Sequence, residues 1–329
     1  MSTSIGAVIN GFLNFRTPNN IVGFIFNRLP PQLVDEIKAL CNEAGTEFLG
    51  YFPNSPECAL ESRKLGLVTP EGVCELKQKT QLLAGKAEQY INISRMLVLS
   101  ESRQLTDLAE MPAKHFHGVR IAVARDTAFS FIYRDNIRFL EHLGAEIIYF
   151  SPINDKKTPD GINGLMLFGG YPELFAEKLS ENRSMMQSIK EKIKSGLPII
   201  AECGGFMYVC NHLVETDDSS MDMLGLIDTD VHMTKRLSMQ FGYVTLNALC
   251  DTAFFKKNTN IRAHEFHYSK ADKRGDSCEI KKYSGKCWNG LYAKENIMAG
   301  YPHFYFHNCR EVAERFVDMA EKISKNLSM

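Results

Sequence analysis

Several features that mark other protein classes are missing from this chain of 329 residues. Its nine cysteines include no Cys-x-x-Cys pair and are odd in number. A disulfide framework or a thiolate zinc site is therefore not expected, and a reducing cytoplasm is the compartment that fits. The close histidine pairs, His264 with His267 and His303 with His307, have no third ligand nearby, so we expect no metal site.

Long apolar runs and a charge excess are missing as well. No apolar stretch reaches the roughly 18 residues that a membrane span needs, and the first residues lack the basic start and apolar segment of a signal peptide. A net charge of −1 creates no field that would attract nucleic acid or an acidic membrane surface. We expect neither as a partner. The hydrophobic content of 44% is instead typical of a globular protein with ample core.

The pattern of apolar residues predicts two α/β segments, residues 1–105 and 118–329, joined by a polar linker. The elements predicted in the first segment are helices at 4–15 and 31–44, strands at 21–26 and 47–51, and a longer helix at 71–98 broken around Gly85. In the second segment, strands and helices alternate from 119 to 201, which predicts a parallel sheet covered on both faces. Short strands are predicted beyond Gly225, at 243–246, 262–268, 279–282 and 297–301, and a helix at 310–323 closes the chain.

The most informative segment is the turn around Cys203. The apolar run Leu197–Ala201 leads into it, two glycines follow at once, and a helical pattern begins at Phe206. A residue on so sharp a strand-to-helix turn is held at the carboxyl edge of a sheet with its side chain exposed, as in the nucleophile elbow of other α/β enzymes. The helix N-terminus would also favour the thiolate. Cys203 is therefore predicted to be a nucleophile, whereas most free cysteines are buried structural residues.

A nucleophilic cysteine needs a base within hydrogen-bond reach and amides aimed at the developing oxyanion. Another predicted strand ends at the same edge in a glycine pair, and the amides of Gly170 and Gly204 are the candidates for the oxyanion hole. The alternative for this glycine pair is a plain tight turn. His303 follows a late strand and precedes the last helix, so it is the predicted base. His307 is the competing histidine, but it lies close to the start of that helix.

Five motifs then occur together and in order: Gly169–Glu173, Ala201–Tyr208, Met233–Leu237, Arg262–Ser269 and Tyr301–His303. Together they resemble the glutamine amidotransferase domain of the cobyrinate a,c-diamide synthase family, over everything from about Gly118 on. The segments Ser2–Ala7, Gly23–Arg28 and Leu65–Pro70 resemble the later part of the ATP-binding domain of the same enzymes. The resemblance implies a flavodoxin-like class I glutamine amidotransferase domain, preceded by a partial P-loop-type α/β ATP-binding domain.

The resemblance also implies an activity, a ligase reaction driven by ATP and Mg²⁺. Glutamine would amidate the a and c acetate side chains of a corrinoid tetrapyrrole, cobyrinate, in cobalamin biosynthesis. Cys203 would attack the glutamine amide and form a thioester, and His303 would take the thiol proton and give it to departing ammonia. Arg262 is the candidate for meeting the polycarboxylate substrate. Glu265 and His267 are candidates for the lining of a domain interface and an ammonia path.

The chain also departs from the family pattern. Phe168 stands where the family usually has a third glycine, and Tyr305 where the wider glutaminase superfamily places the glutamate that orients the histidine. The group that orients His303 is thus left open. Asn27 and Arg28 resemble a strand-end pair near the adenine, but the phosphate-loop pattern Gly-x-x-x-x-Gly-Lys-[Ser/Thr] does not occur. We therefore expect a synthetase truncated at its N-terminus, with an incomplete ATP site and the missing ATP-binding segment as a further partner.

Three alternatives stay open. The same motifs serve the amidation of hydrogenobyrinate, nickel sirohydrochlorin and cobyric acid, although Met233–Leu237 and Arg262–Ser269 favour the a,c-diamide type over the cobyric acid type. An incomplete ATP site is also consistent with an inactive fragment or pseudoenzyme, against which the Cys203–His303 pair argues. The third alternative is a stand-alone cysteine hydrolase, and the same two motifs argue against it.

Overall fold

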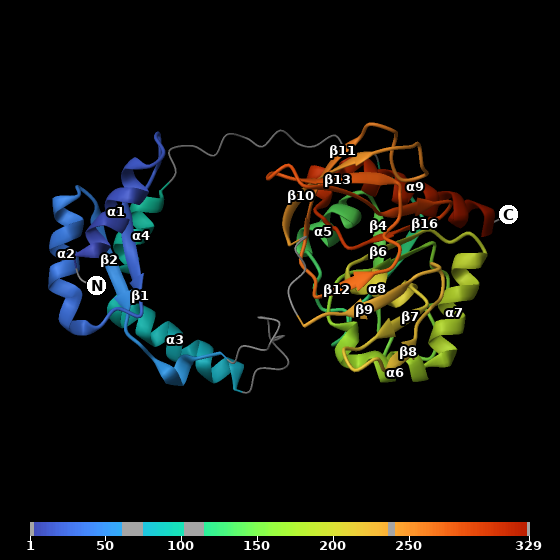
Figure 1. The fold of residues 1–329 in the computed structure, drawn as a ribbon, viewed down its shortest axis with the longest axis horizontal. Helices are drawn as coiled ribbons and strands as arrows, with labels where there is room; N and C mark the ends of the chain where they lie inside the picture. The colour runs from blue at the N-terminus through green and yellow to red at the C-terminus, as the bar shows by residue number, and fades with distance from the viewer. Residues whose placement is uncertain (1–2, 61–74, 102–114, 236–240, 328–329) are drawn as a thin grey trace. The chain divides into compact units, whose positions relative to one another are not determined.

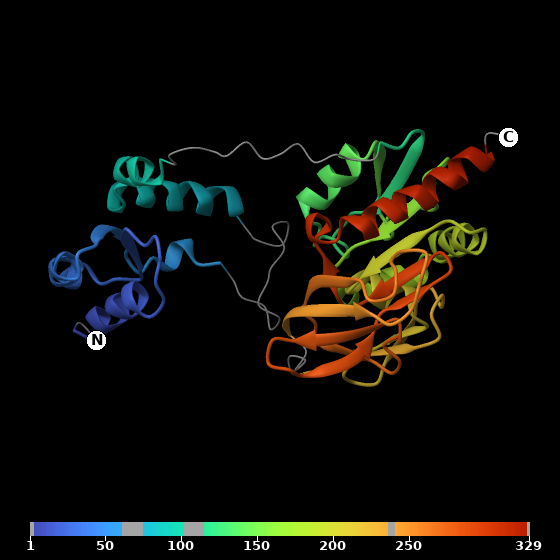
Figure 2. The same ribbon diagram turned by 90° about the horizontal axis from the view of Figure 1, so that it is seen from above.

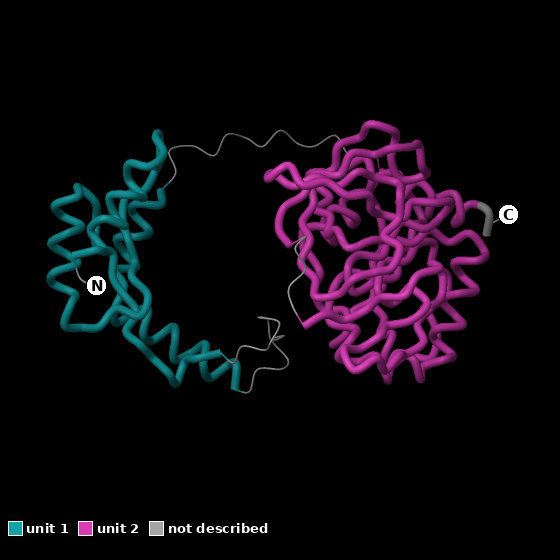
Figure 3. The backbone as a smooth tube through the Cα atoms, viewed as in Figure 1, with its two compact units in different colours: residues 1–110 teal, residues 111–329 magenta. Residues whose placement is uncertain are grey.

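The computed structural model describes residues 3–60, 75–101, 115–235 and 241–327. The chain divides into two units, residues 1–110 and residues 111–329, drawn in two colours in Figure 3. Within the described ranges, no helix has the length and apolar character needed to cross a membrane.

Unit 1 is built around one parallel pair of strands. Its helices and strands are α1 (Ser4–Asn14), β1 (Gly23–Asn27), α2 (Val34–Glu43), β2 (Glu47–Phe52), α3 (Leu76–Tyr90) and α4 (Ile93–Ser100). The buried side chains at the centre of this unit are Ile9, Leu29, Ile37 and Cys41. Every residue of β1 is half-buried or exposed, although strands of parallel sheets are normally covered on both faces.

The long helix predicted at 71–98 is interrupted at a different place from the one expected. Gly85 lies inside α3, and the interruption falls at Ile91 and Asn92. Ile91 forms a bridge with Gly50 of β2, and the Asn92 side chain accepts a hydrogen bond from the Arg95 amide and caps α4. A helix glycine costs only about 1 kcal/mol, so the cap and the bridge decide where the helix ends. The predicted start at 71–74 lies outside the described residues.

Unit 2 is organised by a six-stranded sheet in the order β15–β16–β6–β5–β3–β4, of which Figure 1 labels β4, β6 and β16. Its strands are β3 (Val119–Ala124), β4 (Ala145–Phe150), β5 (Gly164–Leu167), β6 (Ile199–Glu202), β15 (Tyr292–Lys294) and β16 (Ile297–Gly300). All neighbours pair in parallel except β15 with β16. From β4 to β16 this is the strand order of flavodoxin-like doubly wound folds. The predicted flavodoxin-like fold is therefore confirmed.

Two separate cores cover the two faces of this sheet. Alternating residues of β3 divide between them, since Ile121 and Val123 belong to one core and Ala122 and Ala124 to the other. The helices of the first core are α5 (Arg134–His142) and α9 (Arg310–Leu327). The helices of the second core are α6 (Ala176–Glu181), α7 (Arg183–Lys194) and α8 (Gly204–Val209).

Two smaller sheets complete unit 2. A five-stranded sheet has the order β14–β13–β10–β11–β17 and a four-stranded sheet the order β12–β9–β7–β8. Their strands are β7 (His212–Val214), β8 (Ser220–Asp222), β9 (Asp230–Met233), β10 (Gly242–Ala248), β11 (Asn260–Glu265), β12 (Ser269–Ala271), β13 (Cys278–Lys282), β14 (Cys287–Gly290) and β17 (His303–Phe304). The five-stranded sheet, in orange in Figure 2, packs its apolar face into the first core. Because β17 follows β16 closely, this sheet is anchored at the carboxyl edge of the central sheet.

Candidate active site

Cys203 occupies a strained turn between β6 and α8. Its backbone angles are φ 48° and ψ −102°, a conformation that residues other than glycine rarely adopt. The Cys203 amide donates a hydrogen bond of 2.8 Å to the carbonyl oxygen of Gly300, which holds the turn against β16. The strand-to-helix turn expected from the sequence is therefore present. The side chain is not exposed as expected, because only 6% of the residue is accessible to solvent.

The surroundings of the thiol favour its protonated form. Burial raises the pKa of Cys203 most, and the charges of Glu173, Glu265 and Glu202 raise it further. Only the Gly204 amide acts in the opposite direction. The expectation that the start of α8 makes Cys203 a thiolate is therefore wrong, since burial and three carboxylates outweigh one amide. A thiol of this kind needs a base before it can attack.

The glycines chosen for the oxyanion hole lie together beside this thiol. A Cβ atom built on Gly204 would lie 3.0 Å from the backbone nitrogen of Gly170, and one built on Gly170 would overlap the carbonyl oxygen of Ala128. Neither position has room for a side chain. Gly204 is the first residue of α8, where a backbone amide has no partner within the helix. The two candidate amides therefore meet at one place.

His303 is buried at the same edge. β17 places it opposite His264 of β11, and its ring stacks on the His264 ring with centroids 4.9 Å apart. A Cβ on Gly169 would overlap the His303 ring, so this ring lies directly on the glycine pair. Burial, assisted by His264 and His267, lowers the pKa of His303 to about 3. The imidazole is neutral at physiological pH and can accept a proton.

The competing histidine lies elsewhere. His307 belongs to a short 3-10 helix, Phe306–Asn308, and its ring packs against those of Phe139 and Tyr305. It makes no ring contact with His303 or Gly169 among the described residues. The geometry therefore favours His303 over His307 as the partner of Cys203.

Glu265 and His267 lie on the two sides of a residue whose backbone approaches the nucleophile. The carbonyl oxygen of Phe266, between them, lies 3.7 Å from the sulfur of Cys203. Glu265 Oε2 is 3.6 Å from His267 Nε2, and both residues are buried. His267 Nδ1 donates to the carbonyl oxygen of Ser269 at 2.8 Å. These residues line the buried site, and their role at an interface or in an ammonia path stays a prediction.

Comparison with known proteins identifies the arrangement. The CobB/CobQ-like glutamine amidotransferase domain matches residues 120–311. A cobyrinate a,c-diamide synthase of Listeria monocytogenes serotype 4b is 37% identical over 321 residues, which cover 93% of this chain and 69% of that protein. This chain belongs to the cobyrinate a,c-diamide synthase family. It is therefore a glutamine-dependent, amide-forming ligase by family.

Other comparisons cover similar parts of the chain. A second member of the family, from Caldanaerobacter subterraneus, is 33% identical over 332 residues, 99% of this chain and 73% of that protein. Among solved structures, a putative GMP synthase protein from Thermoplasma acidophilum covers 65% of this chain and 100% of its own, with 17% identity and a TM-score of 0.44. A glutamine amidotransferase from Thermotoga maritima covers 63% of this chain and 85% of its own, with 17% identity and a TM-score of 0.40.

Two of the motifs that carry the family resemblance lie side by side. Met233 of β9 pairs with Ser269 of β12, and the Thr234 amide donates to the Tyr268 carbonyl oxygen at 2.7 Å. Arg262 is exposed on β11, on the strand face that also carries His264. Arg262 is thus placed outside the buried site, within reach of a ligand in solvent. Residues 236 and 237 of the first motif lie outside the described residues.

The family implies ATP and Mg²⁺, and the described residues do not fit them. Asn27 and Arg28, the expected adenine neighbours, are exposed at the carboxyl end of β1 in unit 1. Two strand-end side chains provide no cradle of backbone amides for phosphates. Among the described residues, no three His, Cys, Asp or Glu side chains gather where they could hold a metal ion. The part of the chain that the structure describes therefore forms neither a phosphate cradle nor a metal site.

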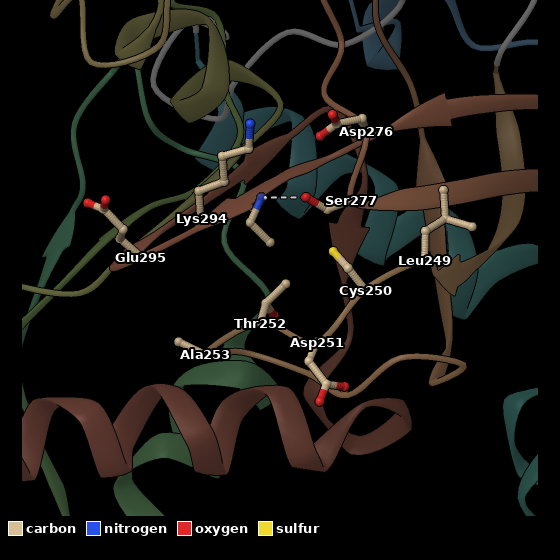
Figure 4. Close-up of a pocket in the computed structure, with 10 residues that line it drawn as sticks. Leu249, Cys250, Asp251, Thr252, Ala253, Asp276, Ser277, Lys294 and Glu295 are labelled. Carbon is tan, nitrogen blue, oxygen red and sulfur yellow. Dashed lines mark hydrogen bonds between the residues drawn. The ribbon is translucent and has the colours of Figure 1, made fainter.

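Unit 2 also has a pocket of about 820 Å³ away from Cys203 (Figure 4). It is lined by the turns next to β10, β13 and β15, from which charged side chains project: Asp251, Asp276, Lys294 and Glu295. Lys294 in the pocket pairs with Ile297, and Ile297 pairs with Ile199, the first residue of β6. Cys203 instead follows the last residue of β6. The pocket therefore lies at the opposite end of the sheet and is separate from the active site.

Proposed function

We propose that unit 2 of this chain is the glutaminase of a cobyrinate a,c-diamide synthase. It hydrolyses glutamine and supplies ammonia for the amidation of the a and c acetate side chains of cobyrinate, in cobalamin biosynthesis. One observation carries the proposal: a buried thiol, a neutral buried imidazole and two close backbone amides meet at the carboxyl edge of the sheet. This set contains the nucleophile, base and oxyanion donors of acyl transfer.

The reaction follows from these groups. His303 takes the proton from Cys203, and the sulfur attacks the side-chain carbonyl carbon of glutamine. The amides of Gly170 and Gly204 stabilise the oxyanion, each donor being worth about 3 kcal/mol in the barrier. His303 then gives its proton to the leaving nitrogen, which departs as ammonia, and water hydrolyses the thioester. The covalent intermediate divides one difficult displacement into two easier steps.

The polar groups at the site suit an amino acid as the substrate. The carboxyl groups of Glu173, Glu265 and Glu202 lie near enough to act on Cys203, while the neighbouring His303 is neutral. Carboxyl oxygens accept hydrogen bonds from an ammonium group, and the α-ammonium group of glutamine is such a donor. The eight described cysteines are all free, which suits a nucleophilic thiol in the reducing cytoplasm. Arg262 is assigned to the corrin carboxylates.

The test is a glutaminase assay on the purified chain, with a glutamine-like electrophile as an active-site label. We expect glutamate release, labelling of Cys203 alone in mass spectrometry, and loss of both in Cys203→Ser. Cys250→Ser is the matched control, because Cys250 is exposed in the separate pocket, and it should keep wild-type activity. A folded wild-type chain that neither releases glutamate nor reacts at Cys203 would support the pseudoenzyme instead.

The tetrapyrrole is tested separately by binding. We expect cobyrinate to bind more tightly than nickel sirohydrochlorin or hydrogenobyrinate, and Arg262→Ala to weaken the binding of cobyrinate without changing glutamine hydrolysis. Preference for another of these tetrapyrroles would reassign the substrate while leaving the glutaminase in place.

A further inference from the structure

The imidazole of His303 faces a carboxylate from the residue that precedes the nucleophile. Glu202 Oε2 lies 3.8 Å from His303 Nδ1. Both residues are buried, with 1% of Glu202 and 5% of His303 exposed. By distance and angle, the two carboxylate oxygens of Glu202 and the Nδ1 atom of His303 have no hydrogen-bond partner among the described residues. Two buried polar groups thus face each other, with the Phe304 backbone as a further group that acts on Glu202, and leaving both unpaired would be costly.

The strand pairing explains how the two side chains meet. Glu202 ends β6 opposite Gly300 of β16, and the chain leaving β16 enters β17 with His303. Side chains alternate along a strand, so Glu202 and Cys203 leave the backbone in different directions. With Nδ1 turned to Glu202, Nε2 is the ring nitrogen that remains for the thiol.

We propose that Glu202 is the positioning residue of this site: its carboxylate accepts a hydrogen bond from Nδ1–H of His303 and so keeps Nε2 free to take the Cys203 proton. The proposal rests on the glutaminase function proposed above. The separation of 3.8 Å exceeds the ~2.7–3.2 Å of an N–H···O hydrogen bond. Contacts between catalytic groups are often long without substrate.

Tyr305 does not compete for this role. It stands two residues after His303, but its hydroxyl donates a hydrogen bond of 3.1 Å to Asp135 Oδ2, and Asp135 is exposed while Tyr305 is half-buried. The carboxylate that faces His303 therefore comes from Glu202 at the end of β6, in the central sheet, and not from the segment that follows His303.

The titratable groups around the pair determine how it responds to pH. His264 and His267 act on His303 and lower its pKa, while Tyr133, Cys203 and Cys309 are the groups on which the Glu202 charge acts. Burial raises the pKa of Glu202 well above its ordinary range, and the Phe304 backbone offsets only part of this rise. Glu202 and His303 together therefore bind one proton at a higher pH than the His303 imidazole would alone. The imidazole acts as a base only after that proton has left. Loss of the proton from the Glu202–His303 pair therefore determines the pH below which kcat/KM falls, the acid limb of the profile.

The test is Glu202→Gln in the full chain, with glutaminase kcat and KM measured against pH. We expect kcat to fall by about 10²-fold or more, KM for glutamine to stay unchanged, and the acid limb of kcat/KM to move to lower pH. Tyr305→Phe is the matched control and should keep the wild-type profile. A Glu202→Gln enzyme with wild-type kcat, or with reduced kcat and an unmoved acid limb, overturns the proposal.

If Glu202→Gln does not fold, the role of Glu202 is tested by a measurement on the wild-type chain. In a sample labelled with ¹⁵N-histidine, the His303 signals are assigned by their loss in His303→Asn. We expect the neutral ring to carry its proton on Nδ1, and a ring protonated on Nε2 overturns the proposal. Because this tautomer is read without turnover, its outcome is distinct from a failure of the proposed glutaminase function.

Discussion

At the scale of single residues, the reacting groups of this site rest without charge. Burial raises the pKa of Cys203 and lowers that of His303 to about 3, so both are neutral near pH 7. The thiolate and imidazolium arise only during proton transfer, in a site from which water is largely excluded. Fixed amides act strongly on charge that develops in such surroundings. The site therefore stabilises the charged groups that form during proton transfer more than the neutral groups at rest.

Glu173 offers a test of how buried carboxylates affect stability. Burial raises the pKa of Glu173 from 4.5 to about 7, so between these values the folded protein holds a proton that the unfolded chain has lost. The contribution of Glu173 to the free energy of unfolding is fully present below pH 4.5 and is lost as the pH rises through about 7. At ~1.4 kcal/mol per pKa unit, the loss is up to about 3 kcal/mol. In Glu173→Gln, we expect the free energy of unfolding, measured by urea denaturation, to fall less between pH 5 and pH 8 than in wild type.

The control for this prediction is Glu177→Gln. Glu177 lies four residues further along the chain, at an exposed position of α6, so its replacement should leave the wild-type pH dependence in place. Parallel stability curves for wild type and Glu173→Gln would show that Glu173 is ionised in the folded protein, contrary to the prediction.

Some residues of the candidate site can be predicted from the sequence and others cannot, for a physical reason. Cys203, Gly170 and Gly204 sit where a strand ends in small residues, and that position is visible in the sequence. Glu202 is not recognised in this way, because a glutamate at the end of an apolar strand looks like a surface residue. The available signal was its place between buried positions, since a fully buried glutamate is rare unless it is paired.

At the scale of elements, the alternation of strands and helices from 119 to 201 was predictable because each element is long enough to show its period. The strand predicted at 262–268 ends at Glu265. There the chain leaves the sheet so that the Phe266 carbonyl reaches Cys203 and Ser269 pairs with Met233. The three-residue strands β7, β8 and β12 are too short for a periodic pattern and depend on tertiary pairing.

The contact of α8 with β5 gives a prediction at this scale. The Gly205 amide donates to the Phe168 carbonyl oxygen at 3.1 Å, and a Cβ on Gly205 would overlap the carbonyl oxygen of Leu167. Gly205→Ala must push the helix away from the strand. We expect a loss of about 3 kcal/mol or more in stability, measured by chemical denaturation, and a fall in glutaminase activity because the Gly204 amide moves with α8.

Gly11→Ala is the matched control. Gly11 lies inside α1 with no atom within 4 Å of the added Cβ, so the same substitution should stabilise that helix by roughly 0.5–1 kcal/mol. If Gly205→Ala is as stable and active as wild type, the close packing of α8 on β5 is not needed.

At the scale of the whole molecule, the two units differ in how well their sheets are covered. Unit 2 packs one core against each face of its six-stranded sheet, although the edge strands β4 and β15 keep some exposed residues. Among the described residues, unit 1 has one pair of strands, and its core cluster has four buried side chains surrounded by partly buried ones. Large apolar side chains stay exposed at Val8 and Phe12 of α1 and at Phe15, which follows this helix. Two strands with so little cover are marginal, because independent stability usually needs three or more strands or a packed apolar face.

This difference predicts that the chain unfolds in two steps. Calorimetry of the full chain should show a small transition at lower temperature and a larger one above it, because unit 1 buries less apolar surface per residue. Hydrogen exchange should assign the first step to β1 and α1, and the second to β3, β5 and β6.

Covalent labelling of Cys203 by a glutamine-like electrophile should raise the temperature of the upper transition alone, since added contacts at that site stabilise only the folded form of unit 2. A single transition in which β1 and β5 lose protection together would mean that the two units fold as one.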